Sequence, residues 1–131
     1  MGQAFKILST LIFLLLGGAA NALSNSEVRN AIQEWISTQE FPQDMGDELT
    51  ILVGSRPTTR GILYNYKLKL DQDDLKNVFQ VFDSIEINAL KGLCTNPAMA
   101  WYKNNEVEMT YRYMDKKKNV ITIFKIHVSD C

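Results

Sequence analysis

The only histidine of the chain, His127, is the first place to look for acid–base chemistry. A catalytic triad or a zinc site needs a histidine with partners, such as a nucleophile, a carboxylate or further metal ligands. The sequence has no second histidine and no H-E-x-x-H motif. In the alternating stretch at 120–128, His127 faces away from Phe124 and Ile126. We therefore expect an exposed, non-catalytic histidine, and we assign no catalytic residue.

Two groups of acidic residues could hold a cation or act as paired acid–base groups. Asp71, Asp73 and Asp74 resemble part of a calcium loop, but the glycine and the distal glutamate of that motif are absent. Helix capping explains these carboxylates better. Glu106 and Glu108 share one face of a predicted strand and could form a carboxylate pair, although a solvated strand face explains them as well. We predict no metal site and no cofactor, and we favour a protein that is not an enzyme.

The first residues have the parts of an export signal. Lys6 supplies a positive charge, an apolar run follows at 7–16, and Ala20 and Ala22 are small residues of the kind that a signal peptidase recognises. The alternative is a membrane anchor, but a spanning helix needs about 20 apolar residues. No cysteine follows for lipid attachment. We expect a cleaved signal peptide at 1–22 and a periplasmic or secreted protein without membrane insertion.

The remaining residues, 23–131, are expected to form a single domain. The chain has a net charge of −1, and removal of Lys6 makes it more negative. Nucleic-acid binding needs a basic field, and the three lysines at 116–118 are too few to provide one. We therefore predict no nucleic-acid partner, and the sequence leaves the oligomeric state open.

Cys94 and Cys131 are the only two cysteines. Export would place them in an oxidising compartment, so an intramolecular disulfide is the first interpretation. Free thiols and an intermolecular bond are the alternatives. Cys131 is the last residue, and terminal residues lose order unless they are held. A disulfide would fasten the last strand and stabilise the domain by roughly 4 kcal/mol in the chain-entropy model.

Apolar periodicity predicts three helices. Ser24 and Glu27 form a capping box at the start of the first helix. The apolar face of this helix consists of Val28, Ile32, Trp35 and Ile36. A long central helix is expected to begin at the acidic residues 71–74 and to end near Leu93. A short helix is expected to follow from Asn96.

Alternating apolar residues predict four strands, at 49–53, 62–70, 107–113 and 120–128. Turn-forming residues at 54–61 and 115–119 join them into two hairpins. We therefore predict an α+β fold with an antiparallel sheet of about four strands. The N-terminal helix and the long central helix are expected to pack on one face of this sheet.

Tyrosine occurs in a repeated pattern. Four of the five tyrosines form two Y-x-Y pairs, at 64–66 and 111–113. In one interpretation, tyrosine suits a sheet face that is half buried. In the other, aromatic side chains form a recognition surface, and one or two of them reach a partner while the rest fill the core. The candidate residues for this binding surface are Trp101, Tyr102, Tyr111, Arg112 and Tyr113.

Short motifs within 60–131 resemble those of a known family. They are L-C-T-N-P at 93–97, T-Y-R-Y at 110–113 and the terminal S-D-C. These motifs are similar to those of small exported bacterial proteins, and the chain most resembles the family of quorum-sensing-regulated virulence factors. The resemblance implies an exported α/β protein with a disulfide between Cys94 and Cys131. It implies a role that is non-enzymatic or unassigned, and it carries over no catalytic residue.

Two functions fit these features. One is a binding or accessory module that acts on another exported protein of the bacterial envelope, in secretion or virulence. The alternative is a small periplasmic hydrolase or ligand carrier whose site is assembled by the fold. A deep polar pocket at His127, or at the face of Glu106 and Glu108, would favour the alternative. A flat apolar and aromatic patch would favour the binding module.

Overall fold

The structure is a computed structural model that describes residues 23–46, 49–70 and 79–131. The expected signal peptide at 1–22 lies outside these residues, as does the expected helix start at 71–74 with its three aspartates. The described helices are α2 (Asn25–Ser37), α3 (Phe79–Thr95) and α4 (Ala100–Asn104), with short 3₁₀ turns η2 (Pro97–Met99) and η3 (Val128–Asp130). The described strands are β1 (Gln43–Asp44), β2 (Thr50–Pro57), β3 (Gly61–Leu68), β4 (Glu108–Met114) and β5 (Val120–Ile126).

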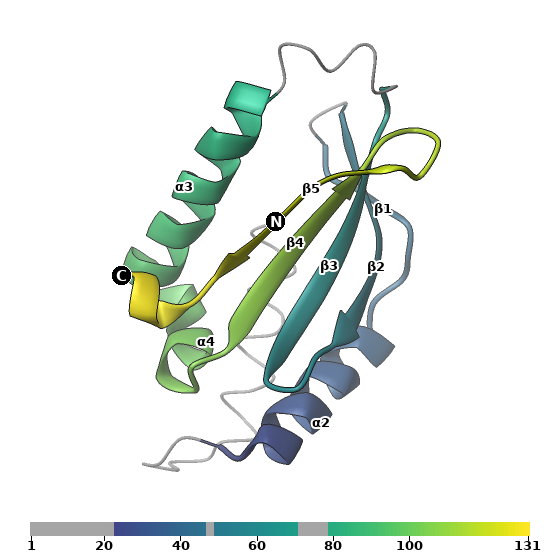
Figure 1. Ribbon diagram of the computed structural model, residues 1–131. Coiled ribbons are helices and arrows are strands. Elements are labelled where there is room, and N and C mark those ends of the chain that lie inside the picture. Colours follow the sequence, from purple (N-terminus) through teal and green to yellow (C-terminus); the bar gives the residue numbers. More distant parts are fainter. Residues whose placement is uncertain (1–22, 47–48, 71–78) are drawn as a thin grey trace.

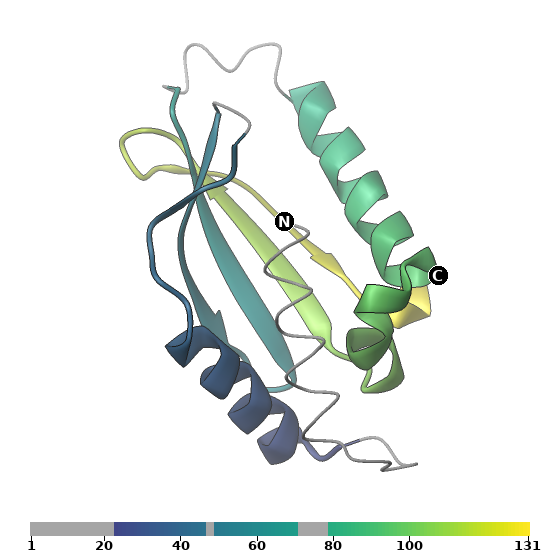
Figure 2. The same ribbon diagram turned by 180° about the vertical axis from the view of Figure 1, so that it is seen from behind.

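The strands form one mixed sheet with helices on one face. Strand order follows the chain, β1-β2-β3-β4-β5. Views from opposite sides show α2, α3 and α4 on the same face, while no described helix covers the other (Figures 1 and 2). The α+β class agrees with the sequence prediction, while the number of strands and the layout of the helices differ somewhat.

The sheet is mostly antiparallel, as the sequence predicts, but it differs from the prediction in two respects. The sheet has a fifth strand, the two-residue β1, which pairs with β2. In addition, β3 and β4 are parallel. The reason is the connection between them. The segment that contains α3 and α4 returns the chain to the end of the sheet at which β3 begins, so β4 runs in the same direction as β3. A parallel pair requires such a crossover.

Helix α2 forms as its sequence predicts. The Ser24 hydroxyl accepts the N–H of Glu27 at 3.3 Å, and the Glu27 carboxylate accepts the N–H of Ser24 at 3.1 Å. This reciprocal capping box satisfies two N–H groups that the first turn leaves without helical partners. The helix buries Val28, Ala31, Ile32 and Trp35 against the sheet.

The two Y-x-Y pairs lie side by side on the helix-covered face. Parallel pairing sets Tyr64 beside Tyr111 and Tyr66 beside Tyr113. The ring centroids of Tyr66 and Tyr113 are 4.9 Å apart, and those of Tyr111 and Phe124 are 4.8 Å apart. All five side chains are buried. Burial raises the pKa of the Tyr64, Tyr66 and Tyr111 hydroxyls, so these three stay neutral within the core.

The hairpin between β4 and β5 turns at Asp115. Its buried carboxylate accepts the N–H groups of Lys117 and Asn119, each at 2.8 Å, and the side-chain amide of Asn119 at 3.1 Å. Lys118 has a φ of 68° and reverses the chain. The predicted turn at 115–119 is therefore confirmed.

This turn is expected to make stability depend on pH. Burial alone would raise the pKa of Asp115, but the hydrogen bonds from Asn119 and Lys117 outweigh burial and lower the pKa. Asp115 then stabilises the fold fully above the unfolded pKa of about 3.9, and this stabilisation is lost as pH falls through the lower folded value.

Asp115→Asn should therefore lower the thermal midpoint near pH 7 and lower it progressively less below about pH 4. Melting curves from pH 2 to 7 test this expectation. Asp83→Asn, at an exposed position of α3, serves as the control. If Asp115→Asn lowers the thermal midpoint equally at every pH, the predicted pH dependence is wrong.

Candidate functional site

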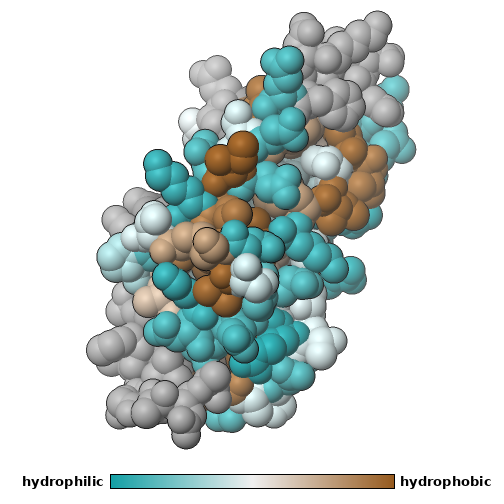
Figure 3. All heavy atoms as spheres, turned by 60° about the vertical axis from the view of Figure 1, so that its left-hand side comes forward, coloured by the Kyte–Doolittle hydropathy of each residue, from teal (hydrophilic) through white to brown (hydrophobic). Residues whose placement is uncertain are grey.

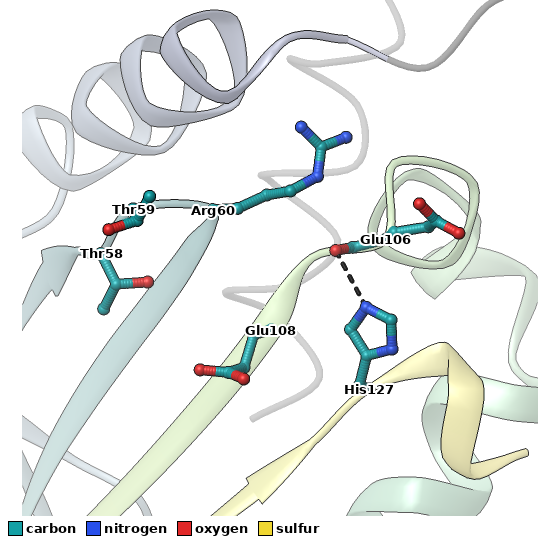
Figure 4. A pocket seen from close by; sticks show the side chains of 6 residues that line it. All are labelled: Thr58, Thr59, Arg60, Glu106, Glu108 and His127. Carbon is teal, nitrogen blue, oxygen red and sulfur yellow. Dashed lines mark hydrogen bonds between the residues drawn. The ribbon is translucent and has the colours of Figure 1, made fainter.

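His127 and the two glutamates that were considered for acid–base chemistry line one polar pocket. The pocket has a volume of about 340 Å³ and lies where β3 begins and β5 ends (Figure 4). Its lining consists of Thr58, Thr59, Arg60, Glu106, Glu108 and His127. The structure thus brings His127 together with both glutamates, although they come from segments that sequence analysis treated separately.

Backbone hydrogen bonds fix the pocket walls. The turn at 58–60 closes with a bond of 2.9 Å from the N–H of Thr58 to the carbonyl of Gly61. The N–H of Glu108 donates to the carbonyl of Arg60 at 3.1 Å and joins this turn to β4. Gly61 is paired with Glu108 in the parallel ladder and leaves no room for a side chain there.

Both ring nitrogens of His127 are engaged. Nδ1 accepts the N–H of Ser129 at 3.0 Å, so the neutral ring carries its proton on Nε2. Nε2 lies 3.1 Å from the carbonyl oxygen of Glu106 and donates to it. The ring therefore caps η3 and ties β5 to the start of β4. It is half-buried, which differs from the expectation of an exposed side chain, and among the described residues no carboxylate is hydrogen-bonded to its ring as a catalytic base requires.

The two glutamates do not form a carboxylate pair. Glu106 has a φ of 52° and precedes β4, so it does not share a strand face with Glu108. Figure 4 shows the two carboxylates pointing in opposite directions. Glu108 instead lies 3.5 Å from the Lys125 ammonium. Across the described ranges, no three histidine, cysteine or acidic side chains are grouped so that they could hold a metal ion.

Arg60 is also committed to the fold. Its Nε and Nη2 atoms donate to the carbonyl of Asn105 at 3.1 and 2.7 Å, and Nη1 donates to the side chain of Asn25 at 2.8 Å. A guanidinium that uses three donors on protein oxygens is a structural clamp. The pocket can admit a small polar molecule, but its charged groups do not converge on one reacting atom.

The candidate aromatic surface is buried, apart from its arginine. Trp101, Tyr102, Tyr111 and Tyr113 lie within the core, and Tyr102 has an exposed fraction of 0%. Arg112 is half-buried on the helix-free face, where it donates to the side chain of Asn65 at 3.2 Å. Four of the five positions therefore fill space between sheet and helices, and the role of Arg112 in binding stays a prediction.

Exposed aliphatic side chains form a feature that the sequence analysis missed. Ile123 and Val120 of β5 are 52% and 46% exposed, and Ile87 and Val81 of α3 are 65% and 44% exposed. Ile123 pairs with Arg112 in the sheet. Figure 3 shows apolar patches among polar side chains on one side of the molecule. The signal was the run V-I-T-I at 120–123, which is apolar at positions of both parities, so that some of these side chains cannot face the core.

The disulfide joins Cys94, at the end of α3, to Cys131. Their Cα atoms are 5.7 Å apart, within the usual range for such a bond. The described residues contain no free cysteine.

Comparison with known proteins shows similarity of fold without similarity of sequence. No family profile and no curated protein sequence matches the chain. A suspected secreted protein from Pseudomonas aeruginosa has a TM-score of 0.67 at 10% identity, over 86% of this chain and 99% of that one.

Two pilotins of type II secretion systems share the same fold. EpsS from Vibrio vulnificus gives a TM-score of 0.61 at 7% identity, over 82% of this chain and 90% of that one. AspS from Vibrio cholerae gives 0.59 at 12% identity, over 82% of this chain and 94% of that one.

Proposed function

We propose that the chain is an exported, non-enzymatic accessory module that binds another exported protein in a secretion-related process. The observation that carries this proposal is the shared fold, which covers 90% or more of each of the two pilotins. Because the fold is shared with almost no sequence identity, its architecture rather than any catalytic motif is what the proteins have in common.

The chemistry of the described residues supports binding. The His127 ring and the Arg60 guanidinium are hydrogen-bonded to backbone carbonyls. The carboxylates of Glu106 and Glu108 point in opposite directions (Figure 4). Both cysteines are held in the disulfide.

No described helix is long and apolar enough to span a membrane. The expected signal peptide and the disulfide support a periplasmic or secreted location. A role in virulence rests on the resemblance of 60–131 to the quorum-sensing-regulated family.

The helix-free face near β5 offers the contact surface. Ile123 supplies exposed apolar area, and Arg112, its partner on the neighbouring strand, supplies a planar cation. Arginine is enriched among the interface residues that contribute most to binding energy. Truncation of either side chain should weaken partner capture by about tenfold, equivalent to about 1.4 kcal/mol, without changing the fold.

The test is photo-crosslinking in the bacterium that makes the protein. A crosslinking residue at position 123 should give a discrete adduct with one envelope protein, and Arg112→Ala should reduce its yield. A crosslinker at position 33, on the exposed side of α2, is the matched control. His127→Ala at matched stability should leave capture unchanged. Equal adducts from positions 33 and 123 would contradict the proposed surface.

A second candidate function is that of a small-ligand carrier or hydrolase. The polar pocket of about 340 Å³ at His127 favours it. In that case His127→Ala should abolish ligand binding or turnover while Arg112→Ala and Ile123→Ala have no effect. The two functions therefore predict opposite rankings of the same three variants.

A further inference from the structure

The first residue of the expected mature chain is held by a buried side chain. The peptide N–H of Leu23 donates to Oδ1 of Asn105 at 2.9 Å, across 82 positions of sequence. The Leu23 side chain is half-buried and packs against the core. A chain end seldom has such specific support, because terminal residues usually lack both packing and hydrogen bonds.

Both the side chain and the backbone carbonyl of Asn105 are held by hydrogen bonds. It is 3% exposed, and its Nδ2 donates to the carbonyl of Trp101 at 2.9 Å. This bond defines the orientation of the amide and turns Oδ1 toward Leu23. The carbonyl of Asn105 accepts both donors of the Arg60 fork, and the third Arg60 donor reaches Asn25 in the first turn of α2. The acceptor for Leu23 is therefore preorganised.

Cleavage would change the chemistry of this contact. Hydrolysis of the Ala22–Leu23 bond adds one water molecule, leaves a carboxylate on Ala22 and leaves an amine on Leu23 that takes up a proton. The peptide N–H at Asn105 would then become an ammonium N–H. A hydrogen bond with an ionised donor is roughly twice as strong as a neutral one. The carboxylate of Glu27 accepts the N–H of Ser24, the residue that follows Leu23.

We propose that Asn105 is the receptor for the α-ammonium group of the processed chain. Signal-peptide removal then creates the ligand of a site that is already built into the domain. The bound terminus ties α2 to the end of α4 and, through Arg60 and Glu106, to the wall of the polar pocket. This inference rests on the expected cleavage after Ala22, and it does not depend on the proposed accessory function.

The test measures how fast a leucine aminopeptidase removes Leu23. The full chain is exported and processed in a bacterial host, and its intact mass establishes the first residue. A synthetic peptide of residues 23–30 provides the rate for an unprotected terminus. The folded protein should be trimmed roughly ten- to a hundredfold more slowly, the factor that corresponds to a charge-assisted hydrogen bond.

Three variants separate the receptor role from general stability. Asn105→Ala removes the acceptor and should abolish the protection. Asn105→Asp keeps an oxygen at the same place and should retain it. Asn30→Ala, at an exposed position of α2, is the matched control and should behave as the wild type. Thermal midpoints show that the compared proteins are folded.

Several results would overturn the proposal. Trimming of the wild type at the rate of the peptide would do so, even if Asn105→Ala does not fold. Protection that persists in a folded Asn105→Ala variant would do so as well. A mature chain that begins at another residue would also remove the ligand from the site, while leaving the accessory function untouched.

Discussion

Replacement of Gly61 by alanine is expected to destabilise the domain by about 3 kcal/mol or more, at the upper end for overpacking. Gly61 begins β3 and is paired with Glu108 in the parallel ladder. A Cβ atom at this position would overlap the carbonyl oxygen of Glu108 and would lie 2.9 Å from its carbonyl carbon. Because these atoms belong to the backbone, no rotamer change can relieve the clash. The two strands would have to separate, and β3 and β4 hold the centre of the sheet.

Urea denaturation monitored by tryptophan fluorescence measures this loss. Gly92→Ala is the matched control, because Gly92 lies inside α3 and a Cβ there meets no atom within 4 Å. That change should stabilise the protein by about 0.5 to 1 kcal/mol through helix propensity. A Gly61→Ala variant within about 0.5 kcal/mol of the wild type would show that β3 and β4 do not approach this closely.

Local signals explain what the sequence predicted well. The capping box of α2 joins Ser24 to Glu27, its buried face consists of apolar residues that recur every three or four positions, and both are present. The turn at Asp115 depends on a side chain that bonds to the backbone two and four residues later. Each signal is complete within a few residues and needs no knowledge of the rest of the chain.

Long-range pairing explains what the sequence analysis missed. Alternation predicts that β3 and β4 are strands, but it does not say which strands are neighbours or in which direction they run. The two predicted hairpins are present, but their alternation is the same whether they pair with each other in parallel or antiparallel. The site has the same difficulty, because Arg60, Glu106 and His127 meet only after β3 and β4 pair in parallel.

The sequence left two interpretations of the tyrosines open for a related reason. A tyrosine in a strand has a polar end and an apolar ring, so its type fits a half-buried face and a recognition surface equally well. Parallel pairing stacks Tyr66 on Tyr113, whose ring also contacts Phe82, and both tyrosines are almost fully buried. Tyr102→Ala should therefore damage the fold rather than a partner contact, and Arg112 is the better probe of binding.

Loss of the disulfide is the second change with a large expected effect, because this bond fastens the last segment of the chain to α3. After β5 ends at Ile126, the chain makes only η3 before Cys131. Figure 1 shows the C-terminus lying beside the end of α3. The bond to Cys94 closes a loop of 37 positions that includes α4, β4 and β5. Restricting so much chain in the unfolded state is what gives a disulfide its stabilising effect.

Cys131→Ala should lower the free energy of unfolding by about 2 to 4 kcal/mol, the usual range for such a bond. Cys94→Ala should have a similar effect, and the double variant should cost little more than either single one, because one bond is lost in each case. Urea denaturation compares all three variants with the disulfide-bonded wild type, and the reduced wild type should resemble the variants. Two reactive thiols in the native protein purified without reductant, or losses in the single variants that add up in the double variant, would contradict a disulfide between these two residues.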